Sequence, residues 1–325
     1  NDTLDGGTGN DFLRGDSGSD TYRFGYGSGV ESIDNNADDY VSAVDVVEFG
    51  ADITVAVLDL VKQGNNLRIG ISGSTDVLQI NDWFTAERYK IDQFRFVDGS
   101  TLSATQLEGL GCKVYGSASN DTLYGSGSSD QVFGYDGVDS IYGRGGNDMV
   151  DGGNGNDYVF GEDGNDLVVG GANDDQVYGG NGNDTLDGGT GNDFLRGDSG
   201  NDTFILGRGY GSDTIVENDA TTGNTDIARF NENIATDQLW FRHVGTNLEV
   251  SIIGTDDKFT IQNWYSGSQY HVEQFKTADG KTLADSNVEA LVSAMASFAV
   301  PGSGQTVLPQ NYQTTLAPVI AANWQ

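Results

Sequence analysis

The feature that most constrains this chain is a repeat of nine residues. From residue 116 to residue 205 the chain divides without gaps into ten nonapeptides, of which the clearest is Gly152-Gly153-Asn154-Gly155-Asn156-Asp157-Tyr158-Val159-Phe160. Position one is glycine, position six is aspartate and position eight is apolar in all ten. A fixed short period predicts a solenoid, in which each repeat buries its apolar side chain only by stacking on its neighbours.

Two columns of residues define the array. The position-six aspartates are Asp121, Asp130, Asp139, Asp148, Asp157, Asp166, Asp175, Asp184, Asp193 and Asp202. The position-eight residues are Leu123, Val132, Ile141, Val150, Val159, Val168, Val177, Leu186, Leu195 and Phe204. The same pattern recurs at residues 1–23, where Asp2, Asp11 and Asp20 hold position six.

A second, longer repeat organises the whole chain. Residues 1–18 and residues 183–200 are identical, and the likeness continues through Trp83 with Trp264 and Gln93-Phe94 with Gln274-Phe275. The chain therefore holds one full unit and the rear part of a preceding one. Because residue 1 falls at the fifth position of a nonapeptide, we expect a longer parent protein upstream.

The nonapeptide predicts its own local structure. Glycines at positions one, two and four allow positive φ, so that six residues can turn tightly with carbonyl groups pointing inward. The next three residues, with an apolar one at the centre, predict a short strand whose middle side chain faces inward. Two such repeats complete one turn of a coil, which gives two parallel sheets with loops along both edges.

Charge and cysteine content narrow the possible ligands. With 16 basic against 49 acidic side chains the formal charge is −33, which argues against nucleic acid as a partner. Cys112 is the only cysteine, so the chain forms no internal disulfide and no cysteine-rich zinc site. Stacked loops that offer carbonyls and carboxylates suit a hard cation with about six to eight oxygen ligands, and Ca²⁺ fits better than Mg²⁺.

The array resembles the calcium-binding nonapeptide repeats of RTX proteins. This resemblance implies an all-β fold, a parallel β-roll (a right-handed β-helix of nonapeptides), with β-rich capping domains and a short C-terminal helix. It also implies that the position-six aspartates ligate Ca²⁺ through their side chains, here Asp11, Asp20 and the ten aspartates of the main array. Main-chain carbonyls of the glycine-rich turns would help, at Gly134, Gly143, Gly152, Gly161, Gly170, Gly179, Gly188, Gly197, Gly145, Asn154, Asp163, Ala172, Asn181 and Thr190.

The number of ions follows from the stacking. If each ion lies between repeat n and repeat n+2, ten repeats give 10 − 2 = 8 sites. The first two repeats depart from the pattern, since Ser117, Ser119, Ser126 and Ser128 stand at positions two and four. Asn173 replaces the position-four glycine of another repeat. We therefore expect about six to eight Ca²⁺ ions in the main array. Apolar burial alone is too small to order so acidic an array, so we expect it to fold only with Ca²⁺.

The segments outside the arrays read as β-rich. Alternating apolar residues predict strands at 44–49, 66–71 and 76–80 in one copy and at 226–230, 247–252 and 257–261 in the other. Both copies are similar to the haemolysin-type calcium-binding-related domain that follows many RTX arrays. This similarity implies a β domain that continues the roll and covers its open end.

The aromatic residues of these copies allow two interpretations. Trp83, Phe84 and Tyr89 in one copy, and Trp264, Tyr265 and Tyr270 in the other, could form a glycan-binding or cell-surface platform. A packed hydrophobic cap explains them as well and is the interpretation we favour. His243 and His271, the only histidines, are expected at exposed polar positions.

The sequence carries no H-E-x-x-H, G-x-S-x-G or P-loop motif, so we do not expect an enzyme. In the last 41 residues, Asp285-Ser286 can cap a helix with Val288, Leu291, Val292, Met295 and Phe298 at helical spacing. After Pro301 the chain is uncharged, and composition alone predicts a flexible tail. The RTX resemblance implies a C-terminal signal for type I secretion there.

The predicted organisation has five segments. They are the end of a truncated roll at 1–23, a capping domain at 24–112, the ten-nonapeptide roll at 113–205, a second capping domain at 206–284, and a helix with secretion signal at 285–325. The chain is thus predicted to be the calcium-binding C-terminal module of a protein secreted by a Gram-negative bacterium. Its partners would be calcium, the ABC transporter machinery and upstream domains. The alternatives are a stalk or binding module of an adhesin or surface-layer protein, and the non-catalytic tail of a toxin, lipase or protease.

Overall fold

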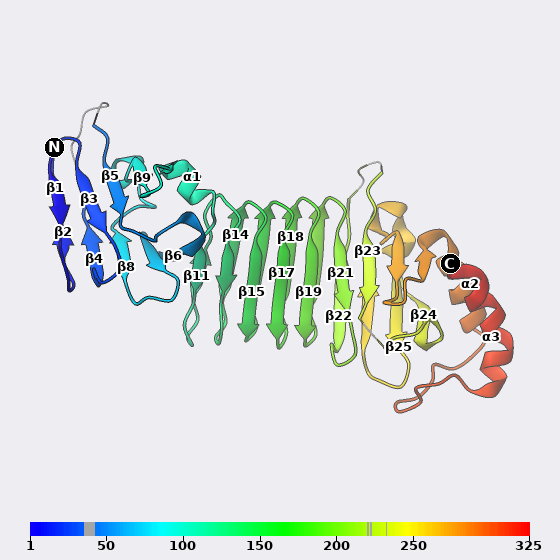
Figure 1. Ribbon diagram of the computed structural model, residues 1–325. Helices are drawn as coiled ribbons and strands as arrows, with labels where there is room; N and C mark the ends of the chain where they lie inside the picture. The colour runs from blue at the N-terminus through cyan, green and yellow to red at the C-terminus, as the bar shows by residue number, and fades with distance from the viewer. Residues whose placement is uncertain (36–42, 220, 222, 232) are drawn as a thin grey trace. The chain divides into compact units, whose positions relative to one another are not determined.

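The structure is a computed structural model, and it describes residues 1–35, 43–219, 221, 223–231 and 233–325. The described residues form two compact units. The first unit holds residues 1–115 with 128–131, and the second holds residues 116–127 with 132–325. The five predicted segments are therefore grouped into two units, each of which joins nonapeptides to a capping segment (Figure 1).

The first unit is almost entirely β. Its strands are β1 (Thr3–Asp5), β2 (Phe12–Leu13), β3 (Thr21–Phe24), β4 (Val30–Ile33), β5 (Val46–Phe49), β6 (Leu58–Gln63), β7 (Asn66–Ile71), β8 (Val77–Ile80), β9 (Gln93–Arg95), β10 (Thr101–Ser103) and β11 (Lys113–Tyr115). It also contains the short helices η1 (Val55–Val57), η2 (Glu87–Tyr89) and α1 (Ala104–Glu108). A capping box between Ser103 and Gln106 begins α1, and the glycines at 109 and 111 follow its end.

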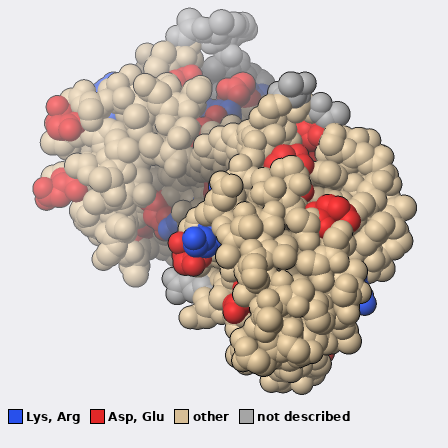
Figure 2. Space-filling view, turned by 90° about the vertical axis from the view of Figure 1, so that its right-hand side faces the viewer, with Lys and Arg blue, Asp and Glu red and all other residues tan. Residues whose placement is uncertain are grey.

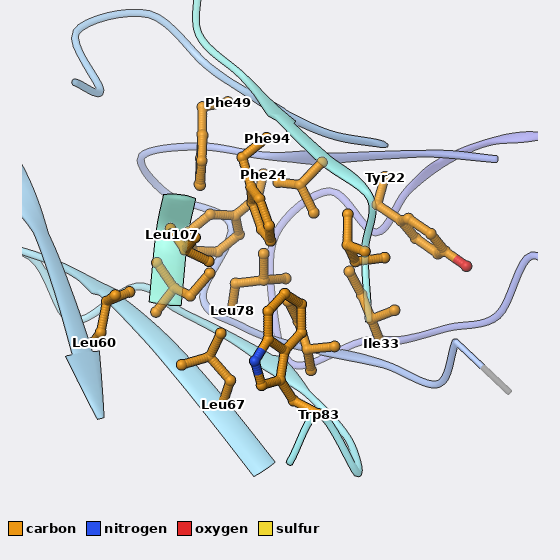
Figure 3. Close-up of a cluster of buried hydrophobic side chains, with 14 of the residues drawn as sticks. Tyr22, Phe24, Ile33, Phe49, Leu60, Leu67, Leu78, Trp83, Phe94 and Leu107 are labelled. Carbon is orange, nitrogen blue, oxygen red and sulfur yellow. The ribbon is translucent and has the colours of Figure 1, made fainter. Parts of the chain in front are cut away.

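Parallel pairing in the first unit continues from the nonapeptides into the cap. One sheet has the order β1-β3-β5-β9-β10, and another runs β2-β4-β8-β7-β6-β11. Among the described residues of this unit, the pairs β9–β10, β6–β7 and β7–β8 are antiparallel. Between the sheets lies a hydrophobic cluster in which the Trp83 ring is fully buried, with its centroid 5.9 Å from that of Phe94 (Figure 3).

The second unit begins with the main array. Its strands are β12 (Thr122–Tyr124), β13 (Gln131–Phe133), β14 (Ser140–Gly145), β15 (Met149–Asn154), β16 (Tyr158–Asp163), β17 (Leu167–Ala172), β18 (Gln176–Asn181), β19 (Thr185–Thr190), β20 (Phe194–Ser199) and β21 (Thr203–Leu206). Alternate strands pair parallel with a register of 18 residues, for example Val159 with Val177. The predicted coil of two nonapeptides per turn is confirmed, and Figure 1 shows these strands as a regular stack.

The strands of the roll are longer than the sequence predicts. Strands β14 to β20 each have six residues, from position seven of one nonapeptide to position three of the next. The prediction of three-residue strands was wrong because glycines at positions one to three still join the parallel ladder, as Gly153 does with Gly171. The position-eight side chains form the core, and all except the half-buried Leu123 are fully buried.

The cap of the second unit continues both sheets of the roll. Its strands are β22 (Ser212–Val216), β23 (Ile227–Phe230), β24 (Leu239–Val244), β25 (Asn247–Ile252), β26 (Lys258–Ile261), β27 (Gln274–Lys276) and β28 (Thr282–Ala284), with η3 (Thr236–Gln238), η4 (Trp264–Ser266) and η5 (Ser268–Tyr270). Strand β22 extends the sheet of β20, and β23 extends that of β21. The six strands predicted outside the arrays are each found to within two residues.

Two helices close the second unit, α2 (Asp285–Met295) and α3 (Gln310–Asn323). Val288, Leu291 and Met295 of α2 are buried as predicted, whereas the N-cap is Ala284 rather than Asp285. The predicted flexible tail is instead helix α3, which packs against α2. Composition missed it because its buried residues, Leu316 and Ile320, are few and widely spaced.

The surface around these helices is poor in charge. Figure 2 views the chain from the side on which α2 and α3 lie, and most of the surface near the viewer carries neither acidic nor basic side chains. This agrees with the uncharged sequence after Pro301. None of the helices among the described residues combines the length and the apolar character that crossing a bilayer requires.

Of the aromatic groups of the two caps, the tryptophans are buried, whereas Phe84, Tyr89, Tyr265 and Tyr270 are half-buried. Trp264, like its counterpart Trp83, is buried. The prediction that both histidines are exposed was wrong for His271. Its ring is half-buried and stacks on Trp264, with 3.9 Å between the ring centroids. Its Nδ1 forms a hydrogen bond of 3.0 Å with Asp285 Oδ2. His243 is exposed and stacks on Tyr265.

Candidate metal sites along the edges of the roll

The turns of the roll occupy positions four to six, and their backbone conformation differs from the prediction at one position. From the repeat that begins at Gly134 onward, positions two and four have positive φ, as at Gly153 (100°) and Gly155 (138°). Four non-glycine residues also adopt this conformation at position two, namely Tyr135, Arg144, Glu162 and Asp198. No position-one glycine of the described array does so, and the expectation of positive φ there was wrong.

Position-one glycines are required for space instead. A Cβ added to Gly179 would lie 2.5 Å from Asp184 Oδ2 and 2.7 Å from the carbonyl oxygen of Gly197, one turn further on. The same convergence recurs at Gly134, Gly143, Gly152, Gly161 and Gly170. Two oxygen atoms therefore lie close to the place that a Cβ would take at each of these glycines. One is a carboxylate oxygen of the same repeat, and the other is a carbonyl oxygen of the next turn.

One oxygen of each aspartate holds the coil together. The Oδ1 atom of Asp184 accepts a hydrogen bond of 2.8 Å from the backbone N–H of Asp166, 18 residues earlier. The same bond joins successive aspartates along both edges of the roll, with distances of 2.7–2.9 Å from Asp121 to Asp193 and from Asp148 to Asp202. The result is one column of aspartates on each edge.

In seven of the ten array aspartates the second oxygen accepts no hydrogen bond from the described residues. The Oδ2 atoms are buried and accept no hydrogen bond within the part of the chain that the structure describes, at Asp139, Asp157, Asp166, Asp175, Asp184, Asp193 and Asp202. A buried carboxylate oxygen without a partner carries a large desolvation cost. A cation bound between the Oδ2 atoms and the position-one carbonyls would remove this cost.

The position-three residues lie at the outer ends of the strands. The carbonyl of Asp163 accepts the N–H of Gly146 at 2.9 Å, and the carbonyl of Thr190 accepts that of Asn173 at 2.7 Å. The corresponding bonds at Asn154, Ala172 and Asn181 have the same form. Because a carbonyl oxygen has two lone pairs, these groups can still ligate a cation. Their role as ligands stays a prediction.

The repeats that lack glycine at position two or four differ in how the substitution affects the aspartate. The Oδ2 atom of Asp121 accepts hydrogen bonds from the backbone N–H and the hydroxyl of Ser117, at 2.6 and 2.8 Å. Ser117 thus hydrogen-bonds to the carboxylate oxygen that is bare in other repeats, so this repeat is a weaker candidate site for an ion. Asn173 adopts the same positive φ as a position-four glycine, and the Oδ2 atom of Asp175 in its repeat remains bare.

The first unit contains the same arrangement in shorter form. Asp20 Oδ1 accepts the N–H of Asp2 at 2.6 Å, and the Oδ2 atoms of Asp11 and Asp20 are buried without a partner. Glu31 lies beside Asp11 in the register of β2 and β4 and is buried with both carboxylate oxygens bare. Sequence reasoning missed Glu31 because it lies outside the nonapeptides.

The aspartate columns also extend beyond the array. Asp193 donates its N–H to Asp213, Asp202 donates to Asp226, and Asp226 donates to Glu273. These three acceptors were not predicted, because the separations of 20, 24 and 47 residues depart from the period of 18. The signal that could have found them is an acidic residue at or directly before the start of a strand that continues the roll.

Burial raises the pKa values of several aspartates in the columns. Desolvation raises the pKa of Asp175 and of Asp202 to about 8 and that of Asp184 to about 7. The backbone hydrogen bond from the preceding aspartate opposes this effect, and neighbouring carboxylates add to it. Without a cation the folded column therefore holds protons at a pH where an unfolded aspartate is ionised.

These shifts predict that acid stabilises the calcium-free fold. A folded carboxyl with a raised pKa binds more protons than the unfolded one, so stability is greatest below about pH 4 and falls as the pH rises to about 8. In metal-free buffer, circular dichroism should therefore show β structure increasing as the pH is lowered. In saturating calcium the trend should disappear or reverse, since protons compete with the ion. A metal-free β signal independent of pH would contradict this prediction.

The chemistry of the donor set fits calcium. The bare atoms are carboxylate and carbonyl oxygens, and no histidine or cysteine contributes to the columns among the described residues. Ca²⁺ accepts about six to eight such oxygens in irregular geometry, whereas Zn²⁺ prefers nitrogen and sulfur. When bound, the ion supplies positive charge that neutralises the column, so its role is structural.

Comparison with protein families agrees with this geometry. Residues 1–29, 115–150, 142–177, 151–186 and 178–213 match the family described as "RTX calcium-binding nonapeptide repeat (4 copies)". Residues 66–106 and 247–286 match the "Haemolysin-type calcium binding protein related domain". The matches cover both arrays and the rear part of each cap.

Individual relatives resemble only part of the chain. It is 34% identical over 93 residues to the iron-regulated protein FrpA of Neisseria meningitidis serogroup C. The match takes in 28% of this chain and 8% of FrpA, so the chain spans a small fraction of that relative's length. Among solved structures, the extracellular lipase LipA from Serratia marcescens is similar over 79% of this chain and 35% of its own, with 17% identity and a TM-score of 0.26.

Proposed function

Since this chain belongs with the RTX proteins through its calcium-binding nonapeptide repeats and its two haemolysin-type calcium-binding-related domains, we propose that it is a calcium-dependent folding module for protein export. The observation that carries the proposal is the pair of aspartate columns, in which seven Oδ2 atoms are buried and accept no hydrogen bond from the described residues. About six to eight Ca²⁺ ions would fill the main array, held by the aspartate side chains and the turn carbonyls. The module is non-catalytic.

The proposed cycle uses the difference in calcium between the two sides of the cell envelope. Inside a Gram-negative cell calcium is scarce, the aspartates repel one another, and the chain stays unfolded and competent for a type I secretion channel. Outside, calcium fills weak sites, for which dissociation constants of about 10⁻⁴–10⁻³ M are usual in extracellular modules. Folding outside opposes back-sliding and helps upstream domains of the parent to fold.

The export assay has calcium as its variable. The full chain is produced with a type I ABC transporter, and the secreted amount is measured over time with calcium or a chelator in the medium. We expect secretion to be severalfold faster with external calcium, because folding outside makes each step irreversible. Equal rates in both media would contradict the ratchet.

The C-terminal signal is tested by a second arm of the assay. Deleting residues 310–325, which form α3 and the end of the chain, should abolish export even though the unfolded chain is otherwise intact. Leu316→Ala is the matched control, since it removes a buried contact of α3 but keeps the segment. It should weaken the folded cap by about 2–5 kcal/mol and leave export in place. Export of the deleted chain at the parent rate would exclude a signal there.

A second candidate is a calcium-rigidified stalk or binding module of an adhesin or surface-layer protein. One observation favours it, a row of aromatic rings stacked along the outer face of the roll, with centroids 4.7–5.1 Å apart from Tyr124 through Tyr142 and Phe160 to Tyr178. Calcium-dependent folding without any calcium effect on export would favour this candidate. The tail of a secreted toxin, lipase or protease is compatible with either function.

A further inference from the structure

A cluster of three carboxylates lies where the roll of the second unit meets its cap. Asp202, Glu217 and Asp226 each place one carboxylate oxygen within 4.8 Å of the other two. Their side chains are 0%, 1% and 1% exposed. Asp202 ends the aspartate column of the array, whereas the other two residues lie outside every nonapeptide. Three carboxylates so close together and so deeply buried must either bind protons or be compensated by a cation.

Strand register explains how the cap builds this cluster. Arg196 pairs with Val216 across β20 and β22, so Glu217 follows at the place where Gly197 follows in the array. Thr203 pairs with Ile227 across β21 and β23, so Asp226 takes the place of a position-six aspartate. The cap therefore repeats the turn of the roll with glutamate in place of the position-one glycine. Its carboxylate stands in the region where the array brings a backbone carbonyl.

Several oxygen atoms around the cluster have no partner. Asp202 Oδ1 accepts the N–H of Asp184, and Glu217 Oε1 accepts the N–H groups of Asn218 and Asp219 at 2.9 and 3.1 Å. The other oxygens, Asp202 Oδ2 and Glu217 Oε2, are buried and bare. The side-chain oxygen of Asn224 is also bare, while its Nδ2 donates to Asp226 Oδ2 at 3.0 Å.

The electrostatic surroundings of Glu217 are entirely acidic. Burial raises its pKa to about 9, and the charges of Asp226 and Asp202 add to the shift. The pKa values of Asp202 and Asp226 rise to about 8 and about 7, also chiefly through burial. Within the described ranges of the chain, no lysine or arginine pairs with any of the three. Either protons or a bound cation therefore neutralises the cluster.

The first unit provides an internal comparison, because the residue at the equivalent position is not acidic. There Asn35 stands in place of Glu217, between Asp20 and Asp45, and Asp20 donates its N–H to Asp45 as Asp202 does to Asp226. The Asn35 amide is satisfied by the protein, since its oxygen accepts from the Tyr22 hydroxyl and its Nδ2 donates to the backbone carbonyl of Lys90. Figure 3 shows this hydroxyl directed away from the hydrophobic cluster.

The second unit lacks this support. Phe204 replaces Tyr22 and is fully buried, so no hydroxyl reaches the position of Glu217. The two units thus use different chemistry at equivalent places, an amide bonded to tyrosine in one and a bare carboxylate in the other. A structural requirement alone does not explain the acid, because the amide already serves that requirement in the first unit.

We propose that Asp202, Glu217 and Asp226 bind a further Ca²⁺ ion, outside the nonapeptide array, with the Asn224 side-chain oxygen as an additional ligand. All donors are oxygen, which suits a hard divalent cation. The ion joins the last nonapeptide to the cap, so the cap closes the roll only after calcium has entered the column. This site adds to the proposed function, since it makes capping as well as coiling depend on calcium.

The test counts calcium ions in the folded chain by native mass spectrometry. Glu217→Gln keeps the shape of the side chain and removes its charge, and we expect this variant to bind one ion fewer than the parent. Asp256→Asn is the matched control, because Asp256 is an exposed carboxylate of the same cap. The control should keep the parent's count. A Glu217→Gln chain with the parent's count would overturn the proposal.

A double exchange decides the case in which the single variant does not fold. Phe204→Tyr with Glu217→Asn copies the Tyr22 and Asn35 pair, which the first unit already accommodates. We expect this chain to fold in calcium with one ion fewer than the parent. Folding with an unchanged count would overturn the proposal, whereas a parent chain that binds no calcium would overturn the proposed function itself.

Discussion

In a calcium chelator at neutral pH the chain is expected to lose most of its β structure, and millimolar calcium is expected to restore it. The reason is the charge of the roll, where buried aspartates such as Asp175 and Asp184 have Oδ2 atoms with no protein partner. An ion at about ten times its dissociation constant contributes about 1.4 kcal/mol to the folded state. About six such sites contribute roughly 8 kcal/mol, which is comparable with the whole stability of an ordinary domain.

The measurement is a calcium titration followed by far-UV circular dichroism, with magnesium as the control. A steep rise of β signal between sub-millimolar and millimolar calcium is expected, because the sites share one cooperative coil. Magnesium should have little effect, since it demands octahedral geometry and retains its waters. A chain already folded in chelator, or one that responds equally to magnesium, would show that the roll is a static scaffold.

The second large effect is expected from Gly179→Ala. The new Cβ would lie 2.5 Å from Asp184 Oδ2 and 2.7 Å from the carbonyl oxygen of Gly197. Neither atom can move freely, because one belongs to a predicted calcium ligand and the other to the backbone of the next turn. We expect a loss of about 3 kcal/mol, the upper part of the usual range for overpacking. Chemical denaturation in saturating calcium measures this loss.

Gly145→Ala is the control for that substitution. Gly145 is a position-three glycine, and a Cβ there would meet no atom closer than 3.8 Å. Ala172 already occupies the same position in another nonapeptide. We expect a change within about 0.5 kcal/mol, as for most substitutions that disturb no contact. Equal losses for the two variants would show that glycine is needed for backbone freedom rather than for space.

The sequence predicted the roll because, in a strict repeat, residues that contact each other are separated by a constant number of residues. Asp166 and Asp184 are 18 residues apart, and so are the strand partners Val159 and Val177. Every residue of the array has the same neighbours at the same separation. The period therefore indicates the register, the inward column at position eight and the line of aspartates on each edge before any coordinates are known.

The same logic explains what the sequence misjudged within the array. Glycine at position one was attributed to positive φ, but the structure shows that it leaves room for Asp Oδ2 and a carbonyl of the next turn. A sequence pattern shows that glycine is required and does not distinguish these two reasons. The difference matters for the site, because the space beside the glycine is where the two candidate ligand oxygens converge.

Outside the array only the tertiary structure identifies partners. Asp226 accepts from Asp202 across 24 residues, Glu273 accepts from Asp226 across 47, and helix α3 packs on α2 through few buried side chains. These separations follow from loops of irregular length, so no sequence period indicates which residues are partners. The sequence determined the coil and its calcium chemistry, because a fixed repeat gives every residue the same neighbours. The tertiary structure decided how the coil ends, because there the neighbours depend on how the chain folds back.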